Sequence, residues 1–108
     1  MLWTVETLNG AVDAELEALP EDMQARFVYI SRLIEEFGLE KVREPHVKHL
    51  TGPLGEMRLK GRGGISRAIY VTATGRRVVV VRAFIKKTQT TPRSELELAM
   101  KRAKEVKP

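Results

Sequence analysis

The sequence predicts an α+β domain in which helices pack on one face of an antiparallel sheet, in the order β-α-α-β-β-β-α. Two observations predict it. Apolar residues recur at helical spacing over residues 12–37, and short strand patterns separated by tight turns follow over residues 56–86. Short turns favour antiparallel pairing, and helices then cover the sheet. Because 108 residues suffice for one core, we expect residues 1–108 to form a single domain.

The N-terminal half is predicted to be mostly helical. A short strand over residues 2–5 precedes Asn9-Gly10, after which a first helix can start. A second helix is predicted over residues 20–37, because apolar side chains recur there at steps of three or four. Residues 39–54 are expected to form an irregular connector, because Gly52-Pro53 interrupts regular structure.

The C-terminal half is predicted to contain three strands and one helix. The strands cover residues 56–60, 65–72 and 77–86, with glycine-containing turns between them. The continuous apolar run of residues 78–81 indicates a central strand that is covered on both faces. The last helix is predicted to start after Thr91, whose hydroxyl suits the capping position.

Charge is divided unevenly along the chain, which has a net charge of +5. Residues 1–40 carry nine acidic and two basic side chains, whereas residues 41–108 carry five acidic and seventeen basic ones. A basic surface of this kind favours an anionic partner, most simply nucleic acid. The alternative interpretation is a solvated charged surface that helps solubility.

Other classes of site are disfavoured by composition. The chain has no cysteine, which excludes disulfides and thiolate zinc sites. His46 and His49 have only Glu44 as a close carboxylate, so we expect no metal and no cofactor. No apolar run approaches the roughly 20 residues that span a membrane. No secretory signal pattern is visible either, so we expect a cytoplasmic protein with no membrane partner.

The face of the predicted sheet that lies opposite the helices gathers cations and an aromatic ring. Arg82, Phe84 and Lys86 alternate along the last strand and point the same way, as do Arg58 and Lys60 on an earlier strand. Cations neutralise phosphates, and an exposed ring can stack on an unpaired base. The alternative is that Phe84 belongs to the core and the cations are edge charges that discourage aggregation.

The contribution of the middle strand to this face stays open. Either Arg67 or Tyr70 can join it, because the sequence does not fix the strand register. Possible acid–base groups are equally open. His46 and His49 lie in the connector and could titrate near neutrality, although a solvated histidine is the commoner situation in such a segment.

Three segments make the C-terminal part recognisable. They are Leu54-Gly-Glu-Met-Arg-Leu, Arg67-Ala-Ile-Tyr70 and Phe84-Ile-Lys-Lys-Thr-Gln-Thr-Thr-Pro, followed by Glu95, Ala99 and Arg102. Together they resemble the HigB-type, phage Gp49-like branch of the RelE toxin superfamily. The resemblance runs from about Leu50 to Lys104, and before it only the strand-helix-helix order agrees.

This resemblance implies a RelE-like domain that acts as the toxin of a bacterial type II toxin–antitoxin system. Such a toxin is an endoribonuclease (mRNA interferase) that cleaves mRNA, usually on the translating ribosome, and so inhibits translation. A HigA-like helix-turn-helix antitoxin would neutralise it. By position, the resemblance places Arg58, Arg67, Tyr70, Phe84, Lys86 and Lys87 on the RNA-facing positions of the family. We expect Arg58, Arg67, Lys86 and Lys87 to be catalytic, and Lys60, Tyr70, Arg82 and Phe84 to bind RNA.

Two positions depart from the family pattern. Gly55 stands where many relatives have Trp, and Arg82-Ala83 stands where many have His-Gly. Some relatives use that histidine as an acid or base, so a different, metal-independent mechanism is expected here. Arginines would clamp the phosphate while Lys86 or Lys87 transfers a proton or stabilises charge during 2′-hydroxyl attack. The alternative is a non-catalytic nucleic-acid- or ribosome-binding module of the same fold.

Overall fold

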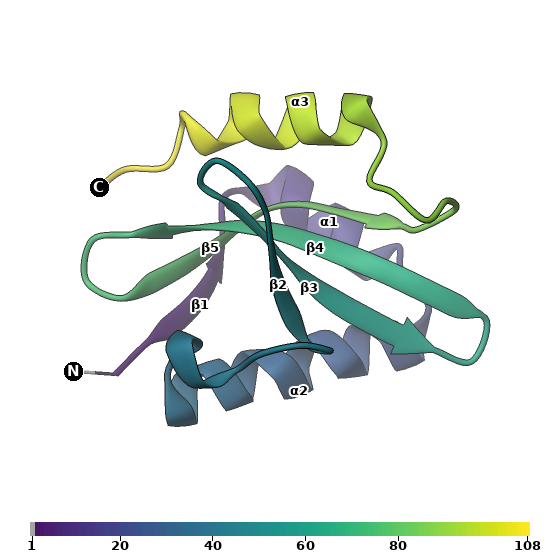
Figure 1. The fold of residues 1–108 in the computed structure, drawn as a ribbon, viewed down its shortest axis with the longest axis horizontal. Helices are drawn as coiled ribbons and strands as arrows, with labels where there is room; N and C mark the ends of the chain where they lie inside the picture. The colour runs from purple at the N-terminus through teal and green to yellow at the C-terminus, as the bar shows by residue number, and fades with distance from the viewer. Residues whose placement is uncertain (1) are drawn as a thin grey trace.

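The computed structural model describes residues 2–108 and confirms the α+β class, with a five-stranded sheet between helices (Figure 1). The elements follow in chain order as β1 (Thr4–Thr7), α1 (Gly10–Glu17), α2 (Glu21–Phe37), the 3₁₀ turn η1 (Leu39–Lys41), β2 (Val47–Thr51), β3 (Leu54–Gly61), β4 (Gly64–Ala73), β5 (Arg77–Ile85) and α3 (Arg93–Ala103).

The sheet is mixed and has the strand order β1-β5-β4-β3-β2. Strands β2 to β5 form the antiparallel meander that the short turns predict. β1 pairs in parallel with β5, with Thr4 opposite Arg77, which the sequence analysis does not anticipate. Parallel pairing needs a long connection, and here α1, α2 and the meander provide it. β5 lies between β1 and β4, and its valines are buried on both faces, as its valine run indicates.

Helices cover both faces of the sheet, whereas the sequence analysis expects them on one face. α1 and α2 cover one face, where Ile34 and Val80 belong to the same apolar cluster. α3 covers part of the other face, where Ala99 clusters with Val81. In Figure 1, α3 lies above the sheet and α2 below it. Periodicity identifies the apolar stripe of a helix but does not say which face of the sheet that stripe will meet.

β2 lies inside residues 39–54, where the sequence predicts an irregular connector, and this prediction is wrong. Gly52 adopts a positive φ of 53°, so Gly52-Pro53 forms the turn that joins β2 to β3. Val47 lies opposite Met57 in the β2–β3 pair, and both side chains are buried. The breaker residues therefore connect two strands instead of excluding them.

The start of α3 also differs from the prediction that Thr91 caps it. Pro92 occupies the N-cap position and makes no side-chain cap. The Thr91 hydroxyl instead accepts a hydrogen bond from Nη1 of Arg67 on β4. A buried guanidinium without acceptors costs more free energy than a missing cap, which explains this use of Thr91.

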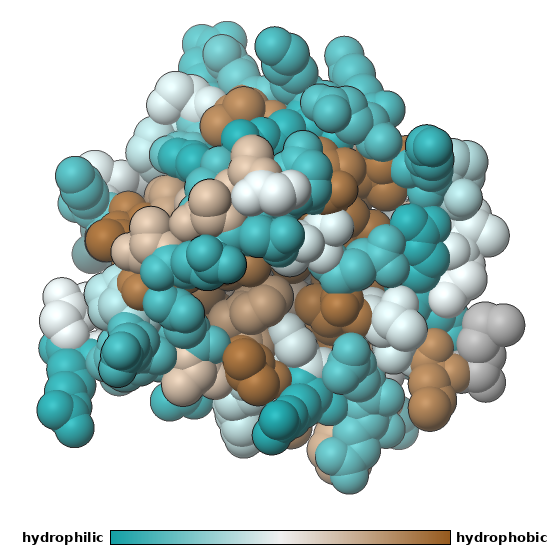
Figure 2. Space-filling view, turned by 180° about the vertical axis from the view of Figure 1, so that it is seen from behind, coloured by the Kyte–Doolittle hydropathy of each residue, from teal (hydrophilic) through white to brown (hydrophobic). Residues whose placement is uncertain are grey.

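The surface on the side of β1 and α1 is mixed in character. Seen from behind, apolar side chains reach the surface near its centre, and hydrophilic side chains project around them (Figure 2).

Candidate nucleic-acid interface

The strand register places the predicted cations in rows across the sheet face that meets α3, called the α3 face below. Arg58 on β3 lies opposite Arg67 on β4. Closer to the β3–β4 turn, Lys60 lies opposite Ile65. The carbonyl oxygen of Ile65 accepts a hydrogen bond of 2.8 Å from the backbone N–H of Lys86, which places Lys86 in the same row. Arg67 therefore joins this face, which settles the register that the sequence leaves open.

Four cations on this face form what we call the open cluster: Lys48, Arg58, Lys60 and Lys86. Lys48 on β2 lies opposite Glu56 of β3. The first three side chains are exposed and that of Lys86 is half-buried. Within residues 2–108, none of the four forms an ion pair. Like charges held this close repel one another, so an anion bound among them would relieve the repulsion.

The pKa of Lys86 differs from that of an ordinary lysine. Desolvation, together with the neighbouring charges of Arg67, Arg58 and Lys48, lowers the pKa of Lys86, and Glu56 only partly opposes the shift. A lowered pKa increases the fraction of neutral amine, which is the form that can accept a proton. Lys86 therefore combines a position in the open cluster with the electrostatics of a general base.

Arg67 is buried, with only 4% of its surface exposed, and within residues 2–108 its Nε forms an ion pair but no hydrogen bond. Its Nε lies 3.2 Å from Oε2 of Glu56, which is also buried. Its Nη2 donates a hydrogen bond of 3.0 Å to the carbonyl oxygen of Gln89, and Nη1 donates to Thr91. Arg67 thus ties the β5–α3 loop to the sheet, and its charge reaches the open cluster only through space.

Arg82 is also neutralised by protein carboxylates. Its Nε and Nη2 donate to the two oxygens of Glu95 at 2.6 Å and 3.0 Å, and its Nη1 lies 3.0 Å from Oε2 of Glu15. The hydrogen bond to Glu95 raises the pKa of Arg82, so the guanidinium stays charged. Glu15 also pairs with Arg102 at 2.9 Å, so the network links α1, β5 and α3.

Glu15 and Arg102 have a second role at the free edge of β5. β1 ends at Thr7, so β5 has no strand partner on that side from Val81 onwards. There the carboxylate of Glu15 accepts a hydrogen bond from the Ala83 N–H, and Arg102 donates one to the Val81 carbonyl. These side chains satisfy backbone groups that a missing strand would otherwise leave unpaired.

The two predicted stacking residues are both buried. Phe84 lies on the α3 face but is only 9% exposed, and Arg82 lies 5.7 Å from its ring centroid. Tyr70 lies on the opposite face, in the cluster with α1 and α2. Burial raises the pKa of Tyr70 to about 12. Both rings are too buried to stack on a base in this conformation. Phe84 belongs to the core, which is the alternative that the sequence left open.

Gly55 explains why Tyr70 can lie where it does. Gly55 pairs with Tyr70 across β3 and β4, and a Cβ added to this glycine would lie 2.5 Å from Cζ of the tyrosine ring. The ring therefore fills the space above a glycine, at the position where many relatives carry Trp. A side chain at residue 55 and the ring at residue 70 exclude each other in this arrangement.

Lys87 is the remaining predicted catalytic residue, and Lys48 belongs to the β2 side of the site. Lys87 is exposed in the loop after β5, next to Lys86. Lys48 lines a groove of about 360 Å³ together with Arg67 and Gln89, between β2 and the β5–α3 loop. The sequence analysis misses Lys48 because it misses β2 itself. The sequence Val-Lys-His-Leu-Thr of β2 shows no regular apolar–polar alternation that would have marked it as a strand.

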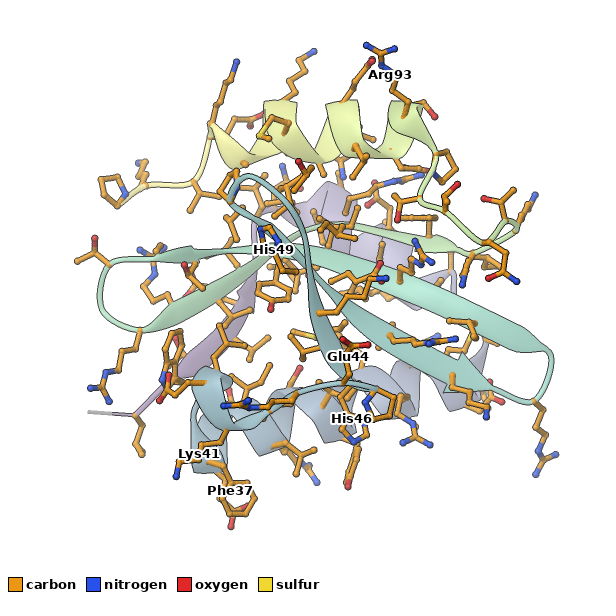
Figure 3. The ribbon with its side chains drawn as sticks, in the orientation of Figure 1. Phe37, Lys41, Glu44, His46, His49 and Arg93 are labelled. Carbon is orange, nitrogen blue, oxygen red and sulfur yellow. The ribbon has the colours of Figure 1, made fainter. Side chains whose placement is uncertain are left out.

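His46 is the second functional candidate that the sequence analysis does not connect to the cations. Its carbonyl oxygen accepts a hydrogen bond of 2.8 Å from the Arg58 N–H, which places it beside β3. His49 lies further along β2 towards α3, and its Nε2 is 2.9 Å from the Gly52 carbonyl oxygen (Figure 3). His46 therefore lies just before β2, and His49 is the middle residue of that strand.

Two further findings apply to the part of the chain that the structure describes. Residues 2–108 bring together no group of three or more His, Cys, Asp or Glu side chains that could hold a metal ion. None of their helices has the length and apolar character needed to cross a lipid bilayer.

Comparisons with known proteins agree with this fold. The family model described as "Phage derived protein Gp49-like (DUF891)" matches residues 14–104. The crystal structure of the archaeal RelE–RelB complex from Pyrococcus horikoshii OT3 contains a similar chain, with a TM-score of 0.56 and 23% sequence identity. The match covers 81% of this chain and 98% of that one, and at this identity it establishes the fold. No curated protein sequence matches significantly.

Proposed function

Because this chain belongs to the phage-derived Gp49-like family of RelE/HigB-type toxins, we propose that it is the toxin of a type II toxin–antitoxin pair and acts as an endoribonuclease. The observation that carries the proposal is the open cluster. Lys48, Arg58, Lys60 and Lys86 converge on one sheet face without carboxylate partners among residues 2–108. A surface of this kind suits the phosphodiester backbone of a single strand.

RNA supplies its own nucleophile, the 2′-hydroxyl. The protein therefore needs to align this group with the phosphate and to stabilise the charge that develops in the transition state. The 2′-oxygen attacks the adjacent phosphorus, the bond to the 5′-oxygen breaks, and a 2′,3′-cyclic phosphate and a 5′-hydroxyl result. In this proposal neutral Lys86 accepts the 2′-hydroxyl proton, and Lys87 donates one to the departing 5′-oxygen. Arg58 and Lys60 stabilise the charge that builds on the phosphoryl oxygens.

The buried arginines have a different part in this proposal. Arg67 contributes positive potential and holds the β5–α3 loop, which carries Lys87, against the sheet. Arg82 holds the start of α3 through Glu95, and Phe84 packs in the apolar cluster beneath α3. Their substitution would impair the toxin through structure and not through lost contacts to RNA.

An antitoxin is the expected partner. The similar chain from Pyrococcus horikoshii is found in a RelE–RelB complex, which supports a protein inhibitor for this chain as well. From the HigB-like motifs we propose a HigA-like helix-turn-helix antitoxin, and we propose mRNA on the translating ribosome as the substrate.

The test is cleavage of a single-stranded RNA, free and on translating ribosomes, compared with the same strand carrying 2′-deoxy sugars. We expect cleavage of the RNA to a cyclic phosphate and resistance of the deoxy strand. Lys86→Gln should reduce the rate by at least about 10²-fold, the usual contribution of a general base. Lys101→Gln, which removes an exposed cation on α3, should cleave normally.

One observation favours a second candidate, a non-catalytic module that binds RNA or the ribosome. Arg82 occupies the strand position where many relatives have histidine, and two carboxylates neutralise it. Binding of RNA or ribosomes without any cleavage, in both assay formats, would select this candidate and remove the nuclease.

A further inference from the structure

A second cationic cavity lies at the edge of β3, where β2 has not yet begun and α2 passes close by. Its volume is about 270 Å³, and its walls come from α2, the segment before β2, β3 and β4. No acidic side chain lines it. The lining residues are Arg26, Pro45, His46, Arg58, Lys60 and Ile65.

An exposed tyrosine holds two of these side chains in place. Tyr29 of α2 is 49% exposed. The guanidinium of Arg26 lies 5.6 Å from the centroid of this ring, and the His46 ring meets it edge-on at 5.9 Å and 72°. Tyr29 therefore sits between Arg26 and His46 and orients both towards one cavity.

The cavity is continuous with the open cluster. Arg58 and Lys60 belong to both, since their backbone lies in β3 and their side chains also line the cavity. A strand held on the α3 face by Arg58 can therefore continue around the edge of β3 towards Arg26. Within residues 2–108, no carboxylate forms an ion pair with Arg26.

We propose that this cavity binds one unpaired ribonucleotide next to the linkage that is cleaved. Arg26 contacts its phosphate, and its base stacks on His46 against the apolar walls of Pro45 and Ile65. Histidine rings stack on splayed-out bases in single-stranded RNA recognition, and a ring already held by a neighbour loses less freedom on binding. The inference rests on the proposed function and adds a subsite to it.

The lining chemistry favours a nucleotide over a protein segment. Three cations around a small apolar pocket match a base attached to a phosphate, whereas a peptide would have to supply carboxylates at three separate points. His46 lies beside α2 at the end of β2 that faces this cavity, away from His49 (Figure 3). His49 therefore serves as a matched control for His46.

The experiment measures how much affinity the protein gains when the bound strand is lengthened. Two 2′-O-methyl RNA strands, which cannot be cleaved, would be compared by fluorescence anisotropy: one of three nucleotides and one extended on both sides. The wild-type protein should bind the longer strand at least about fivefold more tightly than the shorter one, as one added stacked base allows. Arg26→Gln and His46→Ala should lose this gain and still bind the short strand normally.

Controls separate the subsite from general effects. Arg32→Gln on the same helix and His49→Ala on β2 should keep the full gain. Tyr29→Leu should lose the gain, whereas Tyr29→Phe, which keeps the ring, should retain it. If Arg26→Gln and His46→Ala keep the gain while the wild type shows it, the subsite is wrong and the toxin proposal stands. If the wild type binds neither strand, on or off the ribosome, the proposed function itself fails.

Discussion

The α3 face carries two sets of cations that differ in what compensates them. Arg67 and Arg82 are paired with Glu56, Glu95 and Glu15 inside the protein, whereas the open cluster has no such partners within residues 2–108. Both sets follow the same alternating strand pattern in the sequence. The difference separates side chains that hold the fold together from side chains that remain available to an anion.

This comparison changes how loss of function should be interpreted. An alanine in place of Arg67 would remove toxicity whether or not Arg67 touches RNA, because its guanidinium holds Glu56, Gln89 and Thr91. Only substitutions in the open cluster report on catalysis and binding without a large change in stability. The following predictions test that separation, from the largest expected effect on stability to the smallest.

Arg67→Met should destabilise the protein most. It leaves the Glu56 carboxylate buried without its cation, which costs about 3–5 kcal/mol in comparable buried pairs. The loss corresponds to a fall in Tm of roughly 12 °C or more for a domain of this size. Urea unfolding followed by circular dichroism measures it.

The double variant Glu56→Leu/Arg67→Met is the control for this pair. Replacing both charges by apolar groups removes the unpaired carboxylate, so stability should recover much of the loss. A double variant as unstable as the single one would show that the cost comes from the released β5–α3 loop and not from the buried charge.

Loss of the pairing between Arg82 and Glu95 should reduce stability by less than Arg67→Met but by more than Lys86→Gln. Their two hydrogen bonds are charge-assisted and partly exposed, so each single variant, Arg82→Gln or Glu95→Gln, should lose about 1.5–3 kcal/mol. A double-mutant cycle should show that the two losses are not additive. Additive losses would mean that Arg82 is held mainly by Glu15, and the same cycle with Glu15→Gln would then show the coupling.

Lys86→Gln should change stability least and in the favourable direction. Because the folded state lowers the pKa of Lys86, its ammonium form destabilises the fold below that pKa, and the penalty disappears as the pH rises towards 10.5. The variant should therefore be slightly more stable than the wild type at neutral pH and equally stable at high pH. Thermal melts of both proteins across this pH range test the sign.

The cleavage rate should follow the same titration. The rate of the wild type should rise with pH and level off below the ordinary lysine value of 10.5, because the proposed mechanism uses neutral Lys86 as the base. The residual rate of Lys86→Gln should lack this step. A wild-type profile that is flat above neutral pH would assign the base to another group.

Much of the fold could be predicted because its signals are local. Apolar spacing located α2 and the valine run located β5, and strand alternation placed Arg67 and Tyr70 on opposite faces of β4. The missed elements depend on distant partners. β2 is a short edge strand that pairs with β3, and the parallel pairing of β1 with β5 joins segments about 70 residues apart.

The sequence predicts which cations lie at the site, but it does not predict which of them are neutralised by carboxylates of the protein. The sequence identifies Arg82 as a cation on the correct face, yet its neutralisation depends on Glu15 of α1 and Glu95 of α3 meeting over β5. Likewise, the contribution of Tyr29 and Arg26 depends on α2 passing the free edge of β3. These contacts depend on how the helices pack against the sheet, and the periodicity of apolar residues does not specify that packing.

The salt dependence of RNA binding tests the central claim most directly. A non-cleavable 2′-O-methyl RNA would be titrated with wild type, Arg58→Gln and Arg82→Gln over a range of salt concentrations, with folding of each protein verified first. Each phosphate contact on a single strand contributes about 0.7 to the slope of log K against log salt. The slope should fall by about 0.7 for Arg58→Gln and stay at the wild-type value for Arg82→Gln. Equal falls, or a fall for Arg82→Gln alone, would contradict the division between compensated and open cations.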